Sequence, residues 1–117
     1  DGLTADNTYL AIGTNNVSAG NTAEEIKEGL TYVINAIRTR RPEAKITLMG
    51  ILPRRNREAQ IKELNKELKA LAKDIKTDFA DPGRTLLLKN GKIDESLFKD
   101  GLHPNKDGYS LIAPFYN

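Results

Sequence analysis

Three short apolar segments alternate with two amphipathic helical patterns along the first two thirds of this chain. The apolar segments, which we predict to be strands, cover residues 8–12, 45–52 and 77–80. The helical patterns cover about residues 22–41 and 57–76. Strands that alternate with helices pair in parallel through right-handed crossovers. This order therefore predicts an α/β fold built on an open parallel sheet.

Both helical patterns have one apolar face. In the first, Glu25 follows Thr22 by three residues, which predicts a capping box at the helix start, and Pro42 ends the pattern. The apolar residues recur every three or four positions, at Ile26, Leu30, Val33, Ile34 and Ile37 and at Ile61, Leu64, Leu68, Leu71 and Ile75. That spacing predicts that one face of each helix packs against the sheet.

The topology itself indicates where a functional site should lie. In open parallel sheets, ligands bind beyond the carboxyl ends of the strands. Three segments leave those ends here: residues 13–16, residues 53–55, and the long loop that runs from Asp81 towards Asp100 and His103. We therefore expect polar side chains of these segments to form the site.

The charge and the missing residue types argue against several classes of function. Eighteen Lys and Arg against sixteen Asp and Glu leave a net charge of +2, too small to indicate a nucleic-acid or membrane partner. No apolar run is long enough to cross a bilayer, and no segment resembles a signal peptide. Cysteine is absent and His103 is the single histidine, so we expect no disulfide and no metal site. None of these features fixes the compartment.

Asp100 and His103 form the pattern with the clearest chemistry. An Asp and a His three residues apart on a loop can meet through a local turn, where the carboxylate accepts the Nδ1–H of the imidazole. Pro104 biases the histidine away from helical backbone angles. Taken alone the pattern is weak, because Asp100 could be a simple turn residue and His103 could pack near a helix start.

A second polar pattern, Gly13-Thr14-Asn15-Asn16, follows the first predicted strand directly. A side-chain amide at a strand's carboxyl end can donate a hydrogen bond to a developing oxyanion. The same residues could equally form a polar turn, because Gly and Asn tolerate unusual backbone angles.

Three arginines, Arg54, Arg55 and Arg57, follow the second predicted strand. Arg54 is nearest to the strand end, where a guanidinium can recognise an anionic or polar group of a substrate. We interpret Arg55 and Arg57 as residues of a solvated loop.

Together and in this order, the motifs resemble those of the SGNH (GDSL-type) hydrolase family. Residues 13–16 are similar to its third block, Gly-x-Asn-Asp, with Asn16 in place of the usual Asp, and residues 100–103 are similar to its fifth block, Asp-x-x-His. Residues 21–25, 50–54 and 108–109 also resemble this family. The branch that they resemble most contains platelet-activating-factor acetylhydrolases and bacterial carbohydrate esterases.

The resemblance implies a fold and a role for each matching residue. The fold would be a flavodoxin-like three-layer sandwich with a parallel sheet of five strands, of which this chain, residues 1–117, would supply the last three as the C-terminal part of one domain. His103 would be the general base, Asp100 its orienting partner and Asn15 an oxyanion-hole donor. Gly13, Asn16 and Arg54 would contact the substrate, a small-molecule or carbohydrate ester with a small acyl group such as acetyl. The family implies no metal or organic cofactor.

Two family blocks have no counterpart in this chain. One holds the nucleophile in a Gly-Asp-Ser turn, and the other contributes a glycine N–H to the oxyanion hole. The serines present are Ser18, Ser96 and Ser110, and none follows a predicted strand as a nucleophile would. We therefore expect the nucleophile to lie upstream of Asp1.

The missing strands would leave the first predicted strand with an open edge, and an open apolar edge is a template for pairing. We expect a second chain or a second copy to supply the missing strands. We also expect apolar residues of the three strands to be exposed, because the helix that would cover one face is missing too.

Two other functions remain open. The chain could be a binding or interaction domain that keeps the fold without the nucleophile. It could also be a phosphate- or nucleotide-binding module of flavodoxin-like architecture, but such a module needs a glycine-rich loop at a helix start, and residues 13–16 contain one glycine.

Overall fold

The computed structural model describes residues 7–11 and 22–116 of the chain. The described elements include three strands and three α-helices, in the order β1 (Asn7–Ala11), α2 (Ala23–Arg40), β2 (Lys45–Met49), α3 (Glu58–Asp74), β3 (Asp78–Ala80) and α4 (Lys106–Ile112). Short 3₁₀ helices lie between and after them, η1 (Pro82–Leu86), η2 (Glu95–Leu97) and η3 (Ala113–Tyr116). The alternation of strands and helices up to residue 80 is as predicted.

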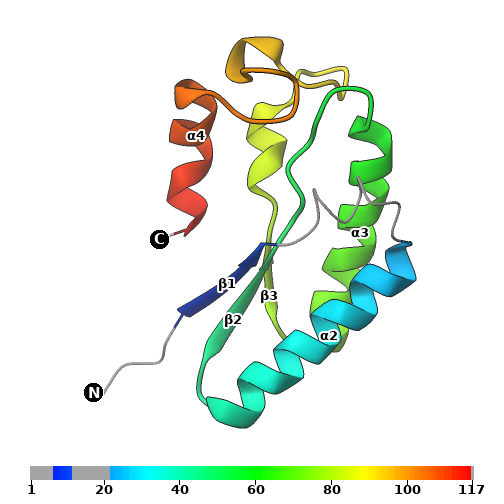
Figure 1. Ribbon diagram of the computed structural model, residues 1–117, viewed down its shortest axis with the longest axis vertical. Coiled ribbons are helices and arrows are strands. Elements are labelled where there is room, and N and C mark those ends of the chain that lie inside the picture. The colour runs from blue at the N-terminus through cyan, green and yellow to red at the C-terminus, as the bar shows by residue number, and fades with distance from the viewer. Residues whose placement is uncertain (1–6, 12–21, 117) are drawn as a thin grey trace.

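The three described strands form one parallel sheet in the order β1-β2-β3 (Figure 1). In the register of β1 and β2, Ala11 lies beside Met49, and Met49 in turn lies beside Ala80 of β3. All three strands therefore end at the same edge of the sheet. This confirms the predicted α/β fold with parallel pairing.

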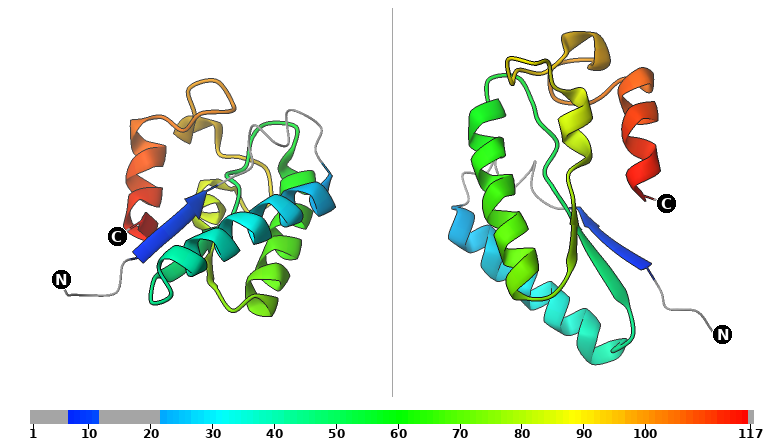
Figure 2. Two further views of the ribbon diagram at one scale, coloured as in Figure 1. Left: turned by 60° about the horizontal axis from the view of Figure 1, so that its bottom comes forward. Right: turned by 180° about the vertical axis from the view of Figure 1, so that it is seen from behind.

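Two helices cover one face of the sheet, and the C-terminal helix lies on the other side. Figures 1 and 2 show α2 and α3 together on one side and α4 on the opposite side. The core under α2 and α3 consists of the buried residues Ile26, Leu30, Leu48, Ile51, Ile61, Leu64, Leu68 and Ala72. Most of them belong to the apolar faces that the helical spacing predicts.

The start of α2 is capped as predicted. The Thr22 hydroxyl accepts the backbone N–H of Glu25 at 3.1 Å, and the Glu25 carboxylate accepts the backbone N–H of Thr22 at 2.9 Å. These bonds satisfy two of the donors that a helix start leaves unpaired.

The second strand is shorter than its apolar run predicts. It pairs as a strand only to Met49, although the apolar run continues to Leu52, and its neighbour β3 ends at Ala80. The Gly50 N–H still donates to the Ala80 carbonyl at 2.7 Å. Beyond it, the buried side chain of Asn65 on α3 takes the place of a strand. It accepts the Ile51 N–H at 2.7 Å and donates to the Ile51 carbonyl at 3.0 Å.

The long loop after β3 has a small core, formed by the buried residues Leu86, Ile93 and Phe98 together with Ile112 of α4. Within the loop, Asn90 and Gly91 form a turn. Gly91 has a positive φ of 86°, and the Leu88 N–H donates to the Lys92 carbonyl at 2.7 Å across the turn. The loop is therefore packed and hydrogen-bonded as a unit.

The expectation that apolar strand residues would be exposed is wrong for the described side chains. In β2, Ile46, Leu48 and Met49 are at most 4% exposed, and the exposed large apolar residues lie on helices and the loop instead. The α2 and α3 helices cover one face of the sheet, and the Tyr116 ring of the C-terminal segment lies 6.2 Å from the ring of Tyr9 in β1. Over residues 7–11 and 22–116, no helix is long and apolar enough to cross a membrane.

Candidate active site

A tight turn brings Asp100 and His103 out of the loop between η2 and α4. On either side of the turn, Phe98 forms an isolated antiparallel bridge with Pro104, and the Lys99 N–H donates to the His103 carbonyl at 2.9 Å. At the apex, Gly101 adopts a φ of +79°, a conformation that glycine accepts without steric cost. The turn therefore projects residues 100–103 as one local unit.

Asp100 and His103 are hydrogen-bonded side chain to side chain, as predicted. Asp100 Oδ2 lies 2.8 Å from His103 Nδ1. Asp100 Oδ1 accepts two backbone N–H groups, from Leu102 at 2.9 Å and from His103 at 2.7 Å. The carboxylate thus binds its partner histidine through both the ring and the main chain.

These donors stabilise the charged form of the carboxyl group. The His103 N–H, the His103 ring and the Leu102 N–H hold the pKa of Asp100 well below its usual range. An ionised carboxylate is only an acceptor, so Nδ1 of His103 must carry the proton. In the neutral ring, Nε2 then carries the lone pair, on a side chain that is 60% exposed. A ring in this state can accept a proton from a group that approaches Nε2.

Asn105, to which the sequence pattern assigns no role, anchors the turn to α4. Its Oδ1 accepts the Gly108 N–H at 3.0 Å as the helix cap, and its Nδ2 donates to the Ser96 carbonyl at 2.8 Å. Gly108 leaves no room for a side chain, because a Cβ there would lie 2.5 Å from the Leu97 carbonyl oxygen. The signal for the cap is in the sequence, since Asn105 directly precedes the last helix.

Of the three arginines, Arg55 contacts the turn. Its N–H donates to the Gly101 carbonyl at 2.8 Å, and its guanidinium binds Glu95 through two hydrogen bonds of 2.7 and 2.6 Å. Arg55 is an exposed loop residue, as interpreted, but the interpretation did not include these contacts. They were missed because Glu95 and Gly101 are distant from it in sequence. Arg57 is exposed and bonds to Gln60 at 3.0 Å, whereas Arg54 is partly buried.

The predicted residues of the first polar segment, Gly13, Asn15 and Asn16, lie outside the described residues. So does Ser18. The end of β1 is nevertheless defined, because Ala11 pairs beside Met49 at the sheet edge from which residues 50–57 continue. The proximity of Asn15 to His103 stays a prediction.

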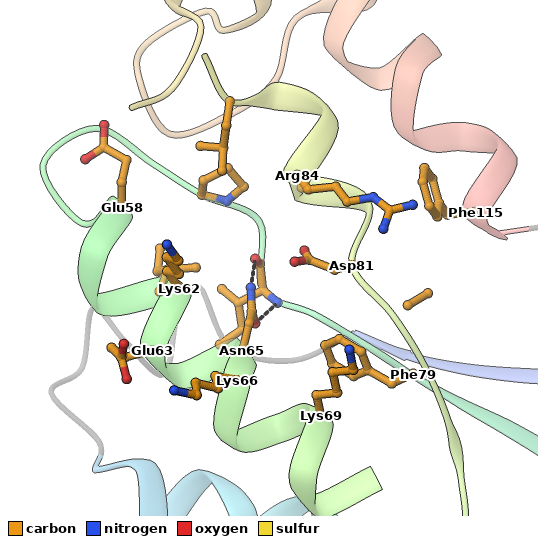
Figure 3. A pocket seen from close by; sticks show the side chains of 16 residues that line it. Glu58, Lys62, Glu63, Asn65, Lys66, Lys69, Phe79, Asp81, Arg84 and Phe115 are labelled. Carbon is orange, nitrogen blue, oxygen red and sulfur yellow. Dashed lines mark hydrogen bonds between the residues drawn. The ribbon is translucent and has the colours of Figure 1, made fainter. Parts of the chain in front are cut away.

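A pocket of about 750 Å³ lies between α3, β3 and η1 (Figure 3). Asp81 borders it with a partly buried carboxyl group, and burial raises the pKa of that group. The Arg84 guanidinium lies 5.7 Å from the centre of the Phe115 ring. Asp100 and His103 are not among the lining residues, so this pocket is separate from the hydrogen-bonded pair.

Within the described ranges, no group of three His, Asp or Glu side chains could hold a metal ion.

The chain matches known proteins over most of its length. The model of the GDSL-like lipase/acylhydrolase family matches residues 1–111. Platelet-activating factor acetylhydrolase IB subunit alpha1 of Homo sapiens is 29% identical over 107 residues, which is 87% of this chain and 46% of that protein. The chain therefore spans about half the length of the curated relatives that it matches.

Solved structures agree with this match. A carbohydrate esterase family 3 protein from Talaromyces cellulolyticus superposes with a TM-score of 0.77 at 26% identity, over 93% of this chain and 54% of that protein. A mutant of an acetyl esterase, crystallised with an acetate ion, superposes with a TM-score of 0.76 at 26% identity, over the same shares of both chains.

Proposed function

Because the chain belongs to the GDSL-like lipase/acylhydrolase (SGNH) family, we propose that it carries the general base of a serine esterase, with His103 as the base and Asp100 as its orienting partner. The observation that carries the proposal is the 2.8 Å contact between Asp100 Oδ2 and His103 Nδ1, made by a carboxyl group whose pKa is held low. The ionised Asp100 keeps the proton on Nδ1, which leaves Nε2 free to act as a base.

The reaction would proceed in two acyl transfers. In the first, the serine oxygen attacks the ester carbonyl while His103 Nε2 takes the serine proton, and Asp100 stabilises the imidazolium. His103 then gives that proton to the leaving alcohol as the ester bond breaks. In the second, water attacks the acyl-serine, His103 again takes a proton, and the carboxylic acid leaves as the serine regains its proton. Asn15 would donate a hydrogen bond to the oxyanion of both tetrahedral intermediates.

The nucleophilic serine would lie on a segment upstream of Asp1. The two serines among the described residues support this, because both hydroxyls are engaged locally. Ser96 Oγ donates to Asp94 Oδ1 at 2.6 Å, and Ser110 Oγ donates to the Lys106 carbonyl at 3.0 Å. The length of the matched relative, of which this chain spans 46%, leaves room for a further segment in proteins of this family.

The substrate would be a carboxylic ester with a small acyl group, such as acetyl on a carbohydrate or a lipid-like alcohol. The names of the matched proteins support this class, because they include an acetylhydrolase, a carbohydrate esterase and an acetyl esterase. Gly13, Asn16 and Arg54 would contact the substrate near the carboxyl ends of the strands. The exposed side of the His103 ring is open to an ester that approaches from solvent.

The alternative is a non-catalytic binding domain that keeps the same turn. A substitution series on the full-length protein separates the two functions, with hydrolysis of p-nitrophenyl acetate as the assay. His103→Ala should lower kcat by several orders of magnitude, because no other histidine in this chain can replace the base. Asp100→Asn should cost somewhat less, and Asn15→Ala about a hundredfold.

Lys89→Ala, an exposed substitution on the same loop, serves as the control and should keep the wild-type rate. Turnover that survives His103→Ala nearly unchanged would show that the assignment is wrong. A folded wild-type protein that hydrolyses no ester would favour the binding domain.

A further inference from the structure

We propose that Arg55 is a positioning residue that holds the Asp100–His103 turn in its productive geometry, an inference that rests on the proposed function of that pair. Arg55 lies on the segment that follows β2, whereas the turn lies between η2 and α4. Arg55 therefore comes from a different segment than the turn that it contacts.

Arg55 ties three segments together through hydrogen bonds. Its backbone N–H donates to the Gly101 carbonyl at 2.8 Å, at the apex of the turn. Its Nε and Nη2 bind the two carboxylate oxygens of Glu95 at 2.7 and 2.6 Å. Two hydrogen bonds from one guanidinium to one carboxylate fix the orientation of the guanidinium plane as well as its position. The side chain of Arg55 is therefore fixed in direction although it is half exposed.

The oriented guanidinium packs directly against Gly101. A Cβ at position 101 would lie 2.6 Å from Arg55 Cζ and 2.9 Å from Nε, both closer than real Cβ contacts. Gly101 itself is buried, with a φ of +79°. The guanidinium thus occupies the space that a side chain at position 101 would fill, and its two bonds to Glu95 hold it there.

Acidic groups around Arg55 also favour its charged form. The guanidinium interacts favourably with Glu95, with Asp100 and with Glu58, and these groups raise the pKa of Arg55, Glu95 most strongly. Because Glu95 binds Nε and Nη2, those donors do not compete with His103 for the Asp100 carboxylate. Glu95 therefore holds the guanidinium against the turn while Asp100 stays bound to the His103 ring.

The test compares Arg55→Gln with Arg57→Gln in the full-length protein. Arg57 is a matched control, because it is an exposed arginine two residues along that bonds to Gln60 and not to the turn. The first readout is kcat and KM for p-nitrophenyl acetate. Arg55→Gln should lower kcat by about tenfold or more with little change in KM, because small displacements of catalytic groups are costly. Arg57→Gln should match the wild type, and Arg55→Lys, which keeps the charge without the paired geometry, should lie between.

The second readout is the pKa of Asp100, followed by carboxyl-carbon NMR and assigned with Asp100→Asn. Arg55→Gln should raise this pKa, because a looser turn donates less to the carboxylate from the backbone N–H groups of Leu102 and His103 and from the His103 ring. Arg57→Gln should leave it unchanged. This readout requires no catalysis, so it tests the positioning role even if the wild-type protein hydrolyses no ester and the proposed function fails.

Glu95→Gln tests the same proposal without removing the arginine. Its kcat should fall about as far as that of Arg55→Gln. The double variant should have a kcat no lower than either single variant, because each variant breaks the same Arg55–Glu95 contact. This variant also decides the matter if Arg55→Gln does not fold. The proposal is overturned if Glu95→Gln behaves like the wild type, or if Arg55→Gln leaves the Asp100 pKa where it is in Arg57→Gln.

Discussion

Asp100 binds His103 at two points, through Oδ2 to the ring Nδ1 at 2.8 Å and through Oδ1 to the backbone N–H at 2.7 Å. The carboxylate therefore fixes both where the histidine lies in the chain and how its ring is turned. All of these contacts fall within four consecutive residues. The orientation of the proposed base thus depends on a local turn, which the rest of the molecule only has to support.

This arrangement predicts how the turn responds to acid. The pKa of Asp100 is lower in the folded chain than its unfolded value of about 3.9. The hydrogen bonds to the ionised Asp100 carboxylate therefore stabilise the fold fully above that unfolded value. This stabilisation is lost as the pH falls through the folded pKa of Asp100. The amide protons of Leu102 and His103, which donate to Asp100, should keep their NMR shifts as the pH falls to about 4. In Asp100→Asn, the same amides should show no acid titration. Amides that move with a midpoint near 4 in the wild type would contradict the low pKa.

Two glycines with positive φ provide a matched pair for the crowding at the turn. Gly91 has a φ of 86°, and a Cβ added there would meet no atom within 4 Å, whereas a Cβ added at Gly101 would overlap Arg55. Gly91→Ala should destabilise the fold by about 1 kcal/mol, the cost of the left-handed conformation alone. Gly101→Ala should cost more in urea unfolding, and Arg55→Ala in the same chain should return part of the loss. Equal costs at the two glycines would show that Arg55 does not crowd the turn.

The buried side-chain amide of Asn65 should contribute more to the free energy of unfolding than the exposed side chains of α3. Asn65→Leu removes both hydrogen bonds to Ile51 and leaves a buried N–H and a buried carbonyl without that partner. We expect a loss of about 2–4 kcal/mol in the free energy of unfolding, measured in urea. Lys66→Ala, an exposed change on the same helix, should stay within about 0.5 kcal/mol of the wild type. A similar small effect for Asn65→Leu would mean that Ile51 finds other partners.

The edge of β1 predicts the assembly state of the 117-residue chain. Among the described residues, β1 pairs with β2 only, so its other edge carries backbone groups that a further strand could bind. We expect the isolated chain to pair with a second copy of itself through this edge. Size-exclusion chromatography with light scattering measures this directly. A monomer of 13.0 kDa that unfolds cooperatively would contradict the prediction.

The sequence by itself determined the elements of the fold and the central pair of the candidate site. The two helices and the parallel order follow from periodicities that extend over a few residues, and the capping box joins Thr22 to Glu25 across one turn. Asp100 and His103 were predictable for the same reason, because three residues of separation allow a turn to join them. Each of these features depends on residues that are close in sequence, so the sequence alone predicts it.

Only the tertiary structure decided which distant residues support that pair and where β2 stops. Asn65 reaches Ile51 across 14 positions, and Arg55 reaches Glu95 across 40. Neither contact has a sequence period, because each depends on how α3 packs on the sheet and how the long loop folds over its own core. The apolar run to Leu52 could not reveal the end of β2 at Met49, since burial and strand pairing favour the same residue types. On one side of β2, its neighbour β3 ends at Ala80, which is the partner of Met49.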